Sequence, residues 1–423
     1  MKRNLTYVGI CLFALFGCKN GGLTSIEVEK SFEEPSVKLE EFRKVLAANP
    51  DGYRMMIQPG SGALISGFIK FETTTAAKFI TDNSLANASG LKDVVYKTSV
   101  IQTNAALSLG ATSSFATIAT AAGADTAYTY KATVGDTILL LGNSKATKLS
   151  LIKLVKADAD AYVAGNLAAV ITEFSKLNNF MYYFKRLSLA GKTYDLVLNT
   201  RLRFVTFNYL DGTTFKSFTT GYTYAQNGIY LNKRFVDGTT IVANLTGLSA
   251  NLTSNTAQGK AGDAAFTVSN SGTPLTYSTT AAATFLAGGN TVIAATNNTL
   301  SWLSYTGFTV AGVTDAFGVT GILGLNYLSY SPKYNVAYDR LGYIVGGAIA
   351  AYGPALIPAV KTNGTIAFTS AGSFGNPAAD YTVRVANVRT QFLDALGYYV
   401  IQSGPVQFDL VNVRDGSSWI SFQ

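Results

Sequence analysis

The residues YTYKATVGDTILLLGNSKATKLSLIKLVK (128–156) indicate which fold class this 423-residue chain adopts. Apolar and polar residues alternate along them with a period of two, which is typical of strands that bury one face. Gly135-Asp136 and Gly142–Ser144 interrupt the alternation, and residues of these types favour turns. The stretch therefore predicts three consecutive antiparallel β-strands.

The same alternation begins at Tyr53, directly after a helical segment. The predicted strands of this region cover residues 53–58, 64–73, 76–82, 93–102, 105–110, 128–143 (two strands) and 148–156. Short antiparallel strands that follow one another this closely are typical of a small barrel or sandwich. The first β-rich module is therefore predicted to be barrel- or sandwich-like, in the manner of a lipocalin.

Two helical patterns flank this module. Residues 26–52 predict one helix, because Phe42 and Leu46 share a face and Asn49–Gly52 ends the pattern. A second helix is predicted over 159–180 from an apolar stripe at helical spacing. The stripe consists of Val163, Leu167, Val170, Ile171, Phe174 and Leu177. This helix is expected to link the first module to a second one and to pack on the first.

A second β-rich region follows the linking helix. Asp211-Gly212 and Asp237-Gly238 each separate two alternating runs, which predicts hairpins with type I′ turns. Near the C-terminus, residues 381–388 predict a strand, and 398–423 predict the closing strands. Residues 246–320 are rich in Thr, Ala, Asn, Ser and Gly, and they predict short strands whose order the pattern does not define.

The predicted fold is mainly β with a few helices, as two antiparallel barrel- or sandwich-like modules joined by a helix. The predicted boundaries are 1–17 for a signal peptide, 18–34 for a tether, 35–158 for the N-terminal helix and first module, 159–180 for the linking helix and 181–423 for the second module. Charged residues make up only 14% of the chain, against about 25% in an average soluble domain. Such a composition suits an extracytoplasmic β-rich protein.

Histidine is absent from the whole sequence. This excludes Ser-His-Asp and Cys-His nucleophile systems and His-ligated zinc sites. Every glutamate lies at or before Glu173, and no spacing selects a pair of carboxylates. We therefore predict no catalytic residue, metal or cofactor and expect no enzyme; a hydrolase acting through aspartates is the catalytic alternative. The net charge of +8 is spread along the strands, so nucleic acid is not an expected partner.

The N-terminus has the features of a lipoprotein signal peptide. Lys2 and Arg3 precede a mostly apolar run that is too short to span a membrane and of the right length for a signal sequence. Leu15-Phe16-Gly17-Cys18 resembles a bacterial lipobox, in which cleavage before the cysteine is followed by its acylation. Cys11 would leave with the leader, so Cys18 would have no disulfide partner within the mature chain. We expect Cys18 to carry acyl chains such as palmitate and to anchor the protein in the outer membrane or at the cell surface.

Several segments in this order resemble a known family. They are the lipobox, LEEFRKVLAANPDGY (39–53), GFIKFE (67–72), YKTSVIQ (96–102), YTYKATVGDTILLLGN (128–143) and YDLVLNTRLRFVTFNY (194–209). Over Lys38–Leu248 the chain is similar to a Bacteroidetes-type family of surface lipoproteins of unknown function. Its members occur near SusC/SusD-like importers and a zinc metallohydrolase lipoprotein, and the family supplies no catalytic residues. The resemblance implies an outer-membrane protein associated with nutrient uptake and with importer proteins as partners.

Aromatic side chains are the candidates for ligand contact. The chain has 24 tyrosines, several of them grouped between residues 327 and 343, and WLSY (302–305) looks like a second exposed group. The candidate ligand-binding residues are Trp302, Tyr305, Tyr330, Tyr334 and Tyr338. Such rings suit a glycan or a peptide, although β-proteins also place tyrosines on half-buried strands. The predicted function is a non-catalytic ligand- or partner-binding accessory of a nutrient-import system, with a structural assembly subunit as a further alternative.

Overall fold

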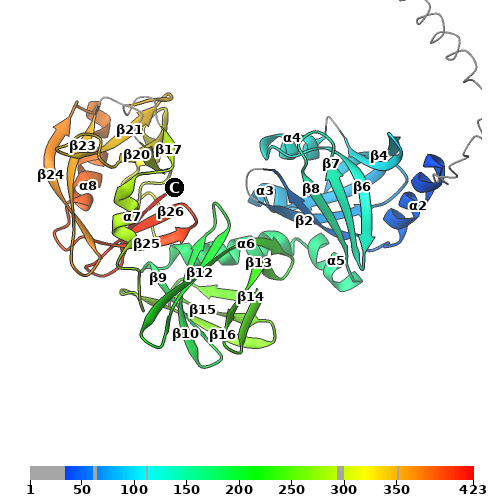
Figure 1. Cartoon of the computed structure of the whole chain (residues 1–423), viewed down its shortest axis with the longest axis horizontal. Helices are drawn as coiled ribbons and strands as arrows, with labels where there is room; N and C mark the ends of the chain where they lie inside the picture. The colour runs from blue at the N-terminus through cyan, green and yellow to red at the C-terminus, as the bar shows by residue number, and fades with distance from the viewer. Residues whose placement is uncertain (1–33, 61–63, 111–112, 293–299, 350–351) are drawn as a thin grey trace, which may run out of the picture.

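The computed structural model describes residues 34–60, 64–110, 113–292, 300–349 and 352–423. The predicted signal peptide and Cys18 lie outside these ranges. Figure 1 shows three β-rich units in chain order: a first barrel, a second barrel in the middle and a third sheet that carries the C-terminus. The mainly β fold class and the two barrel-like modules are confirmed, and the third sheet is additional.

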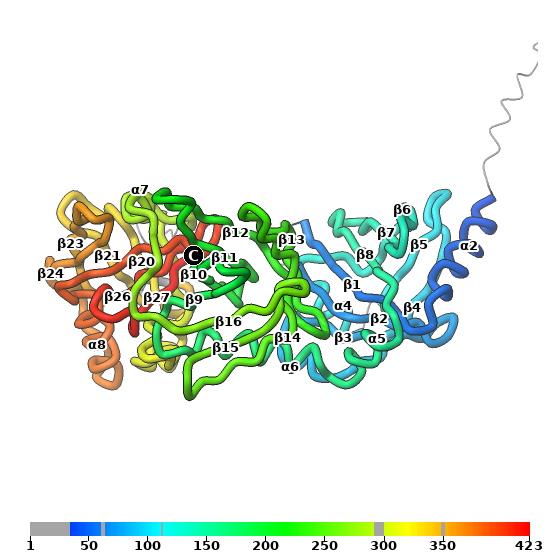
Figure 2. Tube along the Cα trace, turned by 90° about the horizontal axis from the view of Figure 1, so that it is seen from below, coloured from blue at the N-terminus to red at the C-terminus, as the bar shows by residue number. Residues whose placement is uncertain are grey.

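The first barrel is closed, with β1 paired to both β2 and β8. Its strands are β1 (Tyr53–Gln58), β2 (Ile65–Phe71), β3 (Ala76–Thr81), β4 (Lys92–Ile101), β5 (Asn104–Leu109), β6 (Ala127–Val134), β7 (Thr137–Gly142) and β8 (Lys148–Lys153). Before them comes the helix α2 (Pro35–Ala47), whose Phe42 and Leu46 are buried against the barrel core as predicted. Figure 2 shows α2 at the end of the molecule farthest from the third sheet.

Two short helices lie between the strands and were not predicted from the sequence. They are α3 (Leu85–Ala88) and α4 (Ser114–Ala121). In α4, Phe115 and Ile118 insert into the barrel core, and the Ser113 hydroxyl accepts a hydrogen bond from the Ala116 amide at the start of the helix. Helices of this length contain too few turns for a helical period to stand out.

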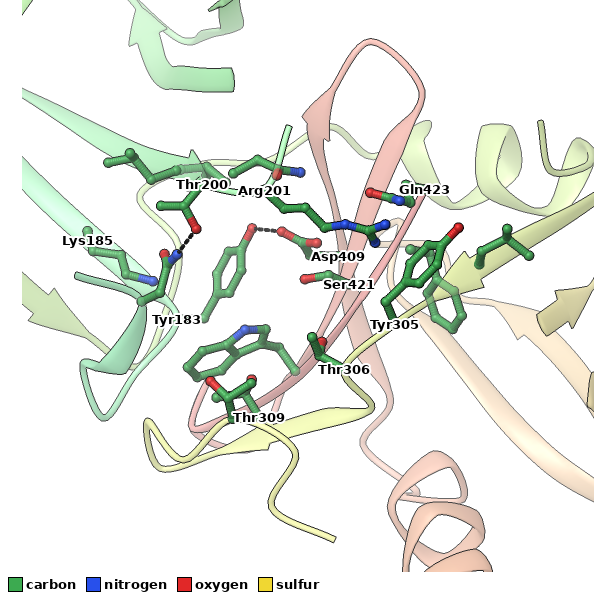
Figure 3. A pocket seen from close by; sticks show the side chains of 18 residues that line it. Tyr183, Lys185, Thr200, Arg201, Tyr305, Thr306, Thr309, Asp409, Ser421 and Gln423 are labelled. Atoms are coloured by element: carbon green, nitrogen blue, oxygen red, sulfur yellow. Dashed lines mark hydrogen bonds between the residues drawn. The ribbon is translucent and has the colours of Figure 1, made fainter. Parts of the chain in front are cut away.

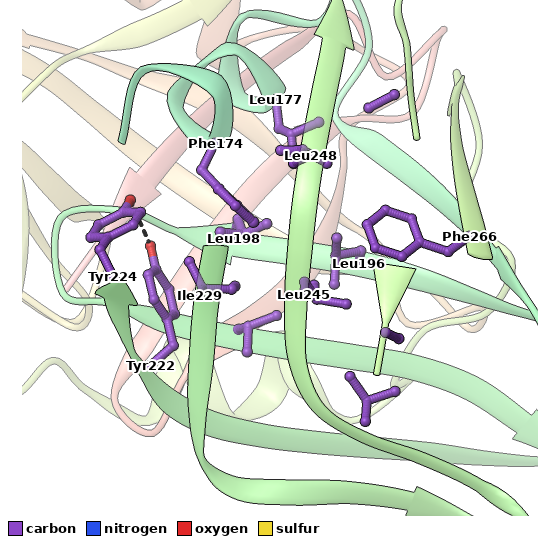
Figure 4. Close-up of a cluster of buried hydrophobic side chains, with 14 of the residues drawn as sticks. Phe174, Leu177, Leu196, Leu198, Tyr222, Tyr224, Ile229, Leu245, Leu248 and Phe266 are labelled. Carbon is purple, nitrogen blue, oxygen red and sulfur yellow. Dashed lines mark hydrogen bonds between the residues drawn. The ribbon is translucent and has the colours of Figure 1, made fainter. Parts of the chain in front are cut away.

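The second barrel has the same consecutive strand order and is closed by β9, which pairs with β10 and β16. Its strands are β9 (Phe184–Leu189), β10 (Lys192–Asn199), β11 (Phe204–Asp211), β12 (Thr214–Ala225), β13 (Gly228–Asp237), β14 (Thr240–Asn251), β15 (Thr256–Ala261) and β16 (Ala264–Ser271). Leu196, Tyr222, Ile229 and Phe266 are among the buried side chains that fill its interior (Figure 4). The interior is a packed core, as in other small barrels.

The two predicted Asp-Gly hairpins form, but with a different turn. Asp211 pairs with Thr214, so the loop is Gly212-Thr213, and the hairpin at Asp237-Gly238 has the same arrangement. Only the glycines of these loops have positive φ angles, +62° and +60°. A positive φ at the first loop position alone is the requirement of a type II′ turn, so the predicted type I′ turn is wrong.

Two helices and a short helical turn connect the barrels. They are α5 (Lys156–Val163), α6 (Asn166–Lys176) and η1 (Leu177–Asn179). Phe174 and Leu177 insert into the core of the second barrel (Figure 4), and Phe68 of the first barrel belongs to the same buried cluster. The linker therefore joins the cores of both barrels, whereas it was expected to pack on the first. The predicted stripe member Val163 is exposed.

The range 181–423 contains the third sheet as well as the second barrel. The strands of the third sheet are β17 (Thr291–Val292), β18 (Leu300–Ser304), β19 (Phe308–Val310), β20 (Leu325–Ser331), β21 (Asp339–Val345), β22 (Ala348–Ile349), β23 (Gly353–Val360), β24 (Ile366–Phe374), β25 (Tyr398–Gly404), β26 (Gln407–Asn412) and β27 (Ser418–Phe422). Leu303 and Gln423 exchange two backbone hydrogen bonds of 2.9 Å. These bonds bring β18 beside β27, so the sheet curls around a core of its own.

The predicted strand over 381–388 is wrong. Most of these residues belong to the helix α8 (Thr382–Phe392), and Val385, Val388 and Phe392 form its buried face. Val383 and Val385, two residues apart, also fit the alternation of a strand, and so short a segment does not separate the two patterns. The helix α7 (Ala281–Ala287) and the turns η3 (Val319–Gly321) and η4 (Ala379–Tyr381) complete the unit. In the part of the chain that the structure describes, no helix has the length and apolar character needed to cross a bilayer.

Candidate functional site

The second barrel packs against the third sheet on the outer face of β26, which would face solvent if the sheet stood alone. Along β26, Phe408 and Leu410 face the core of the third sheet, so Asp409 and Val411 point away from it. Both are buried nevertheless, because the second barrel packs on this outer face. The apolar contact, which we call the joint, consists of Tyr183, Phe184, Val197, Ile401, Val411 and Trp419.

A cavity of about 220 Å³ lies in the joint (Figure 3). It is lined by residues of η1, the adjoining ends of β9 and β10, the residues between β18 and β19, and the strands β26 and β27. Its titratable lining residues are Tyr183, Lys185, Arg201, Tyr305 and Asp409. The volume is below the roughly 300–1,000 Å³ of pockets for drug-sized ligands, so the cavity suits a small molecule.

Lys185 is the most unusual residue of the cavity. It shares a face of β9 with Leu187, which points into the core of the second barrel, and only 4% of the lysine is exposed. Among the described residues its ammonium has no hydrogen bond or ion pair; Nζ lies 5.0 Å from the ring centre of Tyr183 and 5.3 Å from that of Trp419. Burial lowers the pKa of Lys185 to about 8, and the charge of Asp409 partly opposes this effect. The cavity therefore contains a buried amine without a partner.

The carboxylate of the cavity is already bonded. The Tyr183 hydroxyl donates to Oδ2 of Asp409 across the joint, with an oxygen–oxygen distance of 2.5 Å. Burial raises the pKa of Asp409, and the hydrogen bond from Tyr183 opposes the rise. The pair fastens the second barrel to the third sheet, and one of the two carboxylate oxygens is occupied in doing so.

A second cation, Arg201, borders the cavity beyond Tyr183 (Figure 3). Its guanidinium lies over the ring of Tyr305, with Cζ 3.5 Å from the ring centre. The side-chain oxygen of Gln423, in the orientation that faces the guanidinium, accepts hydrogen bonds of 2.8 and 3.3 Å from Nη1 and Nη2. Within the described chain no carboxylate pairs with Arg201. The cavity is thus bordered by two cations that lack an anionic partner.

Hydrolysis by a pair of carboxylates would need two that converge on one substrate. The other buried aspartates have partners elsewhere: Asp82 bonds Arg203, Asp125 bonds backbone amides, Asp195 bonds Arg186 and Asp339 bonds Tyr330. Asp409 is the one side-chain carboxylate that lines the cavity, and the described residues contain no group of three or more His, Cys, Asp or Glu that could hold a metal ion. The cavity therefore presents one side-chain carboxylate and not the converging pair that such hydrolysis uses.

One of the five aromatic residues predicted to contact a ligand, Tyr305, lines the cavity. Trp302 and Tyr330 are instead buried in the core of the third sheet, where both rings stack on Phe285 of α7. The expected exposure of Trp302 is therefore wrong, because α7 covers its side of β18. Tyr334 and Tyr338 stack on each other between β20 and β21, with ring centres 6.1 Å apart, and do not line the cavity.

Lys185 and Arg201 are absent from the residues predicted from sequence. No strand was predicted over residues 181–187, directly after the predicted helix 159–180, whereas β9 begins at Phe184. A lysine two residues before an inward-facing leucine is the signal that could have identified Lys185, once the strand was recognised. Arg201 follows β10 in a turn and has no sequence signal of its own.

The pH dependence of stability tests the state of Lys185. We expect the free energy of unfolding of the wild type to rise, relative to that of Lys185→Met, between pH 8 and pH 10. The folded chain loses the Lys185 proton near pH 8 and the unfolded chain only near 10.5, so the unfolded state binds more protons in this window. Above pH 10 the buried tyrosines act in the opposite direction, because burial raises their pKa values.

Denaturant midpoints at several pH values measure this difference. Lys216→Met, at an exposed position of β12, is the matched control and should keep the pH dependence of the wild type. Parallel curves for the wild type and Lys185→Met would contradict a depressed pKa at Lys185.

Comparisons with known proteins identify a family but no activity. A family model described as "Domain of unknown function (DUF4302)" matches residues 35–247. This range includes the whole first barrel and the second barrel as far as β14. Among solved structures, the chain is similar to the β chain of DNA polymerase III from Streptococcus pneumoniae TIGR4 (9% identity, 91% of this chain, 97% of that chain, TM-score 0.14). It is also similar to the DNA polymerase sliding clamp from Bacillus subtilis (9% identity, 91% and 96%, TM-score 0.13). Scores this low carry no argument about fold or function. No curated protein matches the chain.

Proposed function

Since the chain belongs to the family described as "Domain of unknown function (DUF4302)", which supplies no activity to carry over, we propose a function from the site itself. The protein is a lipid-anchored, non-catalytic binding protein of the cell surface, and the cavity in the joint holds its ligand. The observation that carries this proposal is Lys185, buried in the cavity without a partner among the described residues. Burying an unpaired ammonium is costly, and a bound ligand would provide the missing partner.

The proposed anchor is Cys18, on the strength of its lipobox-like surroundings. The described chain begins next to α2, at the end of the molecule farthest from the third sheet (Figure 2). The anchor would therefore join the described chain at the end with α2, away from the joint (Figure 2). The proposed partner is a SusC/SusD-like importer, on the basis of the family resemblance over Lys38–Leu248, and the ligand would be a nutrient for that importer.

Membrane fractionation of the native organism tests the anchor. The wild-type chain should sediment with the outer membrane, resist extraction by high salt, and yield an acylated N-terminal peptide beginning at Cys18. Cys18→Ala should lose all acyl mass, because the cysteine is the proposed acylation site. It should then leave this fraction, since stable attachment needs two or more acyl chains. Importer proteins should co-purify with the wild type from detergent-solubilised membranes. Lys185→Met is the matched control and should stay anchored. A soluble, unacylated wild type would refute the anchor.

A further inference from the structure

We propose that the cavity in the joint binds a small polar organic anion, whose carboxylate or phosphate group contacts the amine of Lys185. The proposal rests on the ligand-binding function proposed above and names the chemical class of the ligand. It follows from the position of Lys185, from the second cation at Arg201, and from the hydrogen-bonding groups between them.

The first step is the incomplete compensation of Lys185. The rings of Tyr183 and Trp419 lie 5.0 and 5.3 Å from Nζ and provide cation–π attraction. Neither ring accepts a hydrogen bond as a charged oxygen does, and no carboxylate lies within the 4.0 Å of an ion pair among the described residues. The ammonium has three donors, and an anionic oxygen in the cavity would be the natural acceptor for at least one of them.

The second step is the sign of the charge around the cavity. Lys185 and Arg201 both lack an ion pair, and these two cations outnumber Asp409, the one side-chain carboxylate that lines the cavity. A cationic ligand would meet two like charges against one carboxylate, and a neutral ligand would leave the ammonium of Lys185 without an ion pair. An anion gains from both cations, and removal of water from the small cavity strengthens these interactions.

The third step concerns the part of the ligand that does not carry the charge. Besides the charged groups, the cavity presents the hydroxyls of Thr306, Thr309 and Ser421 and the amide of Asn178. These groups donate and accept hydrogen bonds, so they suit a molecule with hydroxyl groups beside its anionic group. A volume of about 220 Å³ restricts that molecule to the size of a monosaccharide derivative or a small organic acid.

Calorimetric titration with matched probes tests the proposal. The probes are glucuronate, glucose 6-phosphate and succinate, with glucose and succinamide as neutral counterparts. We expect at least one anion to bind the wild type at least tenfold more tightly than its neutral counterpart. The carboxylate and phosphate probes decide which anionic group is preferred. Lys185→Met should weaken that binding about 30-fold or more, Arg201→Met should weaken it less, and Lys216→Met should leave it unchanged.

Proton uptake distinguishes contact with Lys185 from a general attraction to positive charge. At pH 8.5 most of the free protein carries a neutral Lys185, so a bound anion should draw a proton onto it. Titrations with a carboxylate probe in buffers of different ionisation enthalpy should show uptake of a fraction of a proton at pH 8.5 and none at pH 6.5. Lys185→Met should show none at either pH.

Equal binding of anions and neutral counterparts, or an affinity that Lys185→Met leaves unchanged, would overturn the anionic class. If neutral probes bind and Trp419→Phe weakens them, the cavity is still a ligand site and the proposed function stands. If no probe binds the wild type, the anionic class is wrong for ligands of this size, and the anchor is judged separately from the fractionation of Cys18→Ala.

Discussion

Arg203→Ala is expected to lower the free energy of unfolding by about 3–5 kcal/mol, because it leaves a buried carboxylate without its counter-ion. Arg203, in the segment after β10, donates through Nη1 to Oδ2 of Asp82 at 2.8 Å. The Asp82 side chain is fully buried and the Arg203 side chain is 10% exposed. The same guanidinium donates to the backbone oxygens of Leu64 and Asp82 at 2.7 and 2.6 Å. These bonds attach the second barrel to the first, so their loss should also reduce the coupling between the barrels.

A double-mutant cycle separates the ion pair from the other contacts. Asp82→Ala combined with Arg203→Ala should cost less than the sum of the single variants, since no charge then remains buried without a partner. Chemical denaturation, followed by fluorescence and circular dichroism, measures each variant. Lys156→Ala removes the exposed pair with Asp160 and should leave the midpoint unchanged. If Arg203→Ala lowered the free energy of unfolding by less than about 1 kcal/mol, the Asp82–Arg203 ion pair would not stabilise the fold as proposed.

Phe285→Ala is expected to cost about 3–5 kcal/mol, because it creates a cavity at the centre of the third sheet. Phe285 is fully buried. Its ring stacks on Trp302 and Tyr330, with centre distances of 5.7 and 5.1 Å, and its backbone oxygen accepts a hydrogen bond from Trp302 Nε1 at 2.9 Å. Few neighbours can move into the space, since the surrounding rings already pack on one another.

Phe285→Leu keeps most of the volume and should cost less than about 1.5 kcal/mol. Val383→Ala, at a position of α8 that is 69% exposed, is the matched control and should change stability by no more than about 0.5 kcal/mol. The fluorescence of Trp302 should shift to longer wavelength in Phe285→Ala, which locates the disturbance in the third sheet. A normal midpoint for Phe285→Ala would mean that α7 does not hold this core together.

Much of the fold could be predicted because strand signals are local. The alternation in 128–156 and the glycines at its turns predict neighbouring antiparallel strands, which is the arrangement found in β6, β7 and β8. Errors arose where a segment was short or its period ambiguous, as in α4 and α8. The boundary between the second barrel and the third sheet was missed because both consist of the same kinds of strand.

The candidate site could not be predicted from the sequence, for a different reason. Whether the outer face of a strand meets water or another sheet depends on segments far away in the chain. Tyr183 bonds Asp409, 226 residues later, and Trp302 is buried because α7 folds back over it. Tyr305, chosen for its aromatic character alone, does line the cavity, but no pattern connects it with Lys185.

By itself the sequence therefore determined the β-rich class, the run of short antiparallel strands over 53–153 and the absence of histidine chemistry, and it left barrel and sandwich open. These follow from periodicity over a few residues and from composition. Only the tertiary structure decided which polar side chains are buried together. Packing of the second barrel on β26 and β27 shields Lys185 and Asp409 from bulk water, and this partial desolvation shifts the pKa values of both residues.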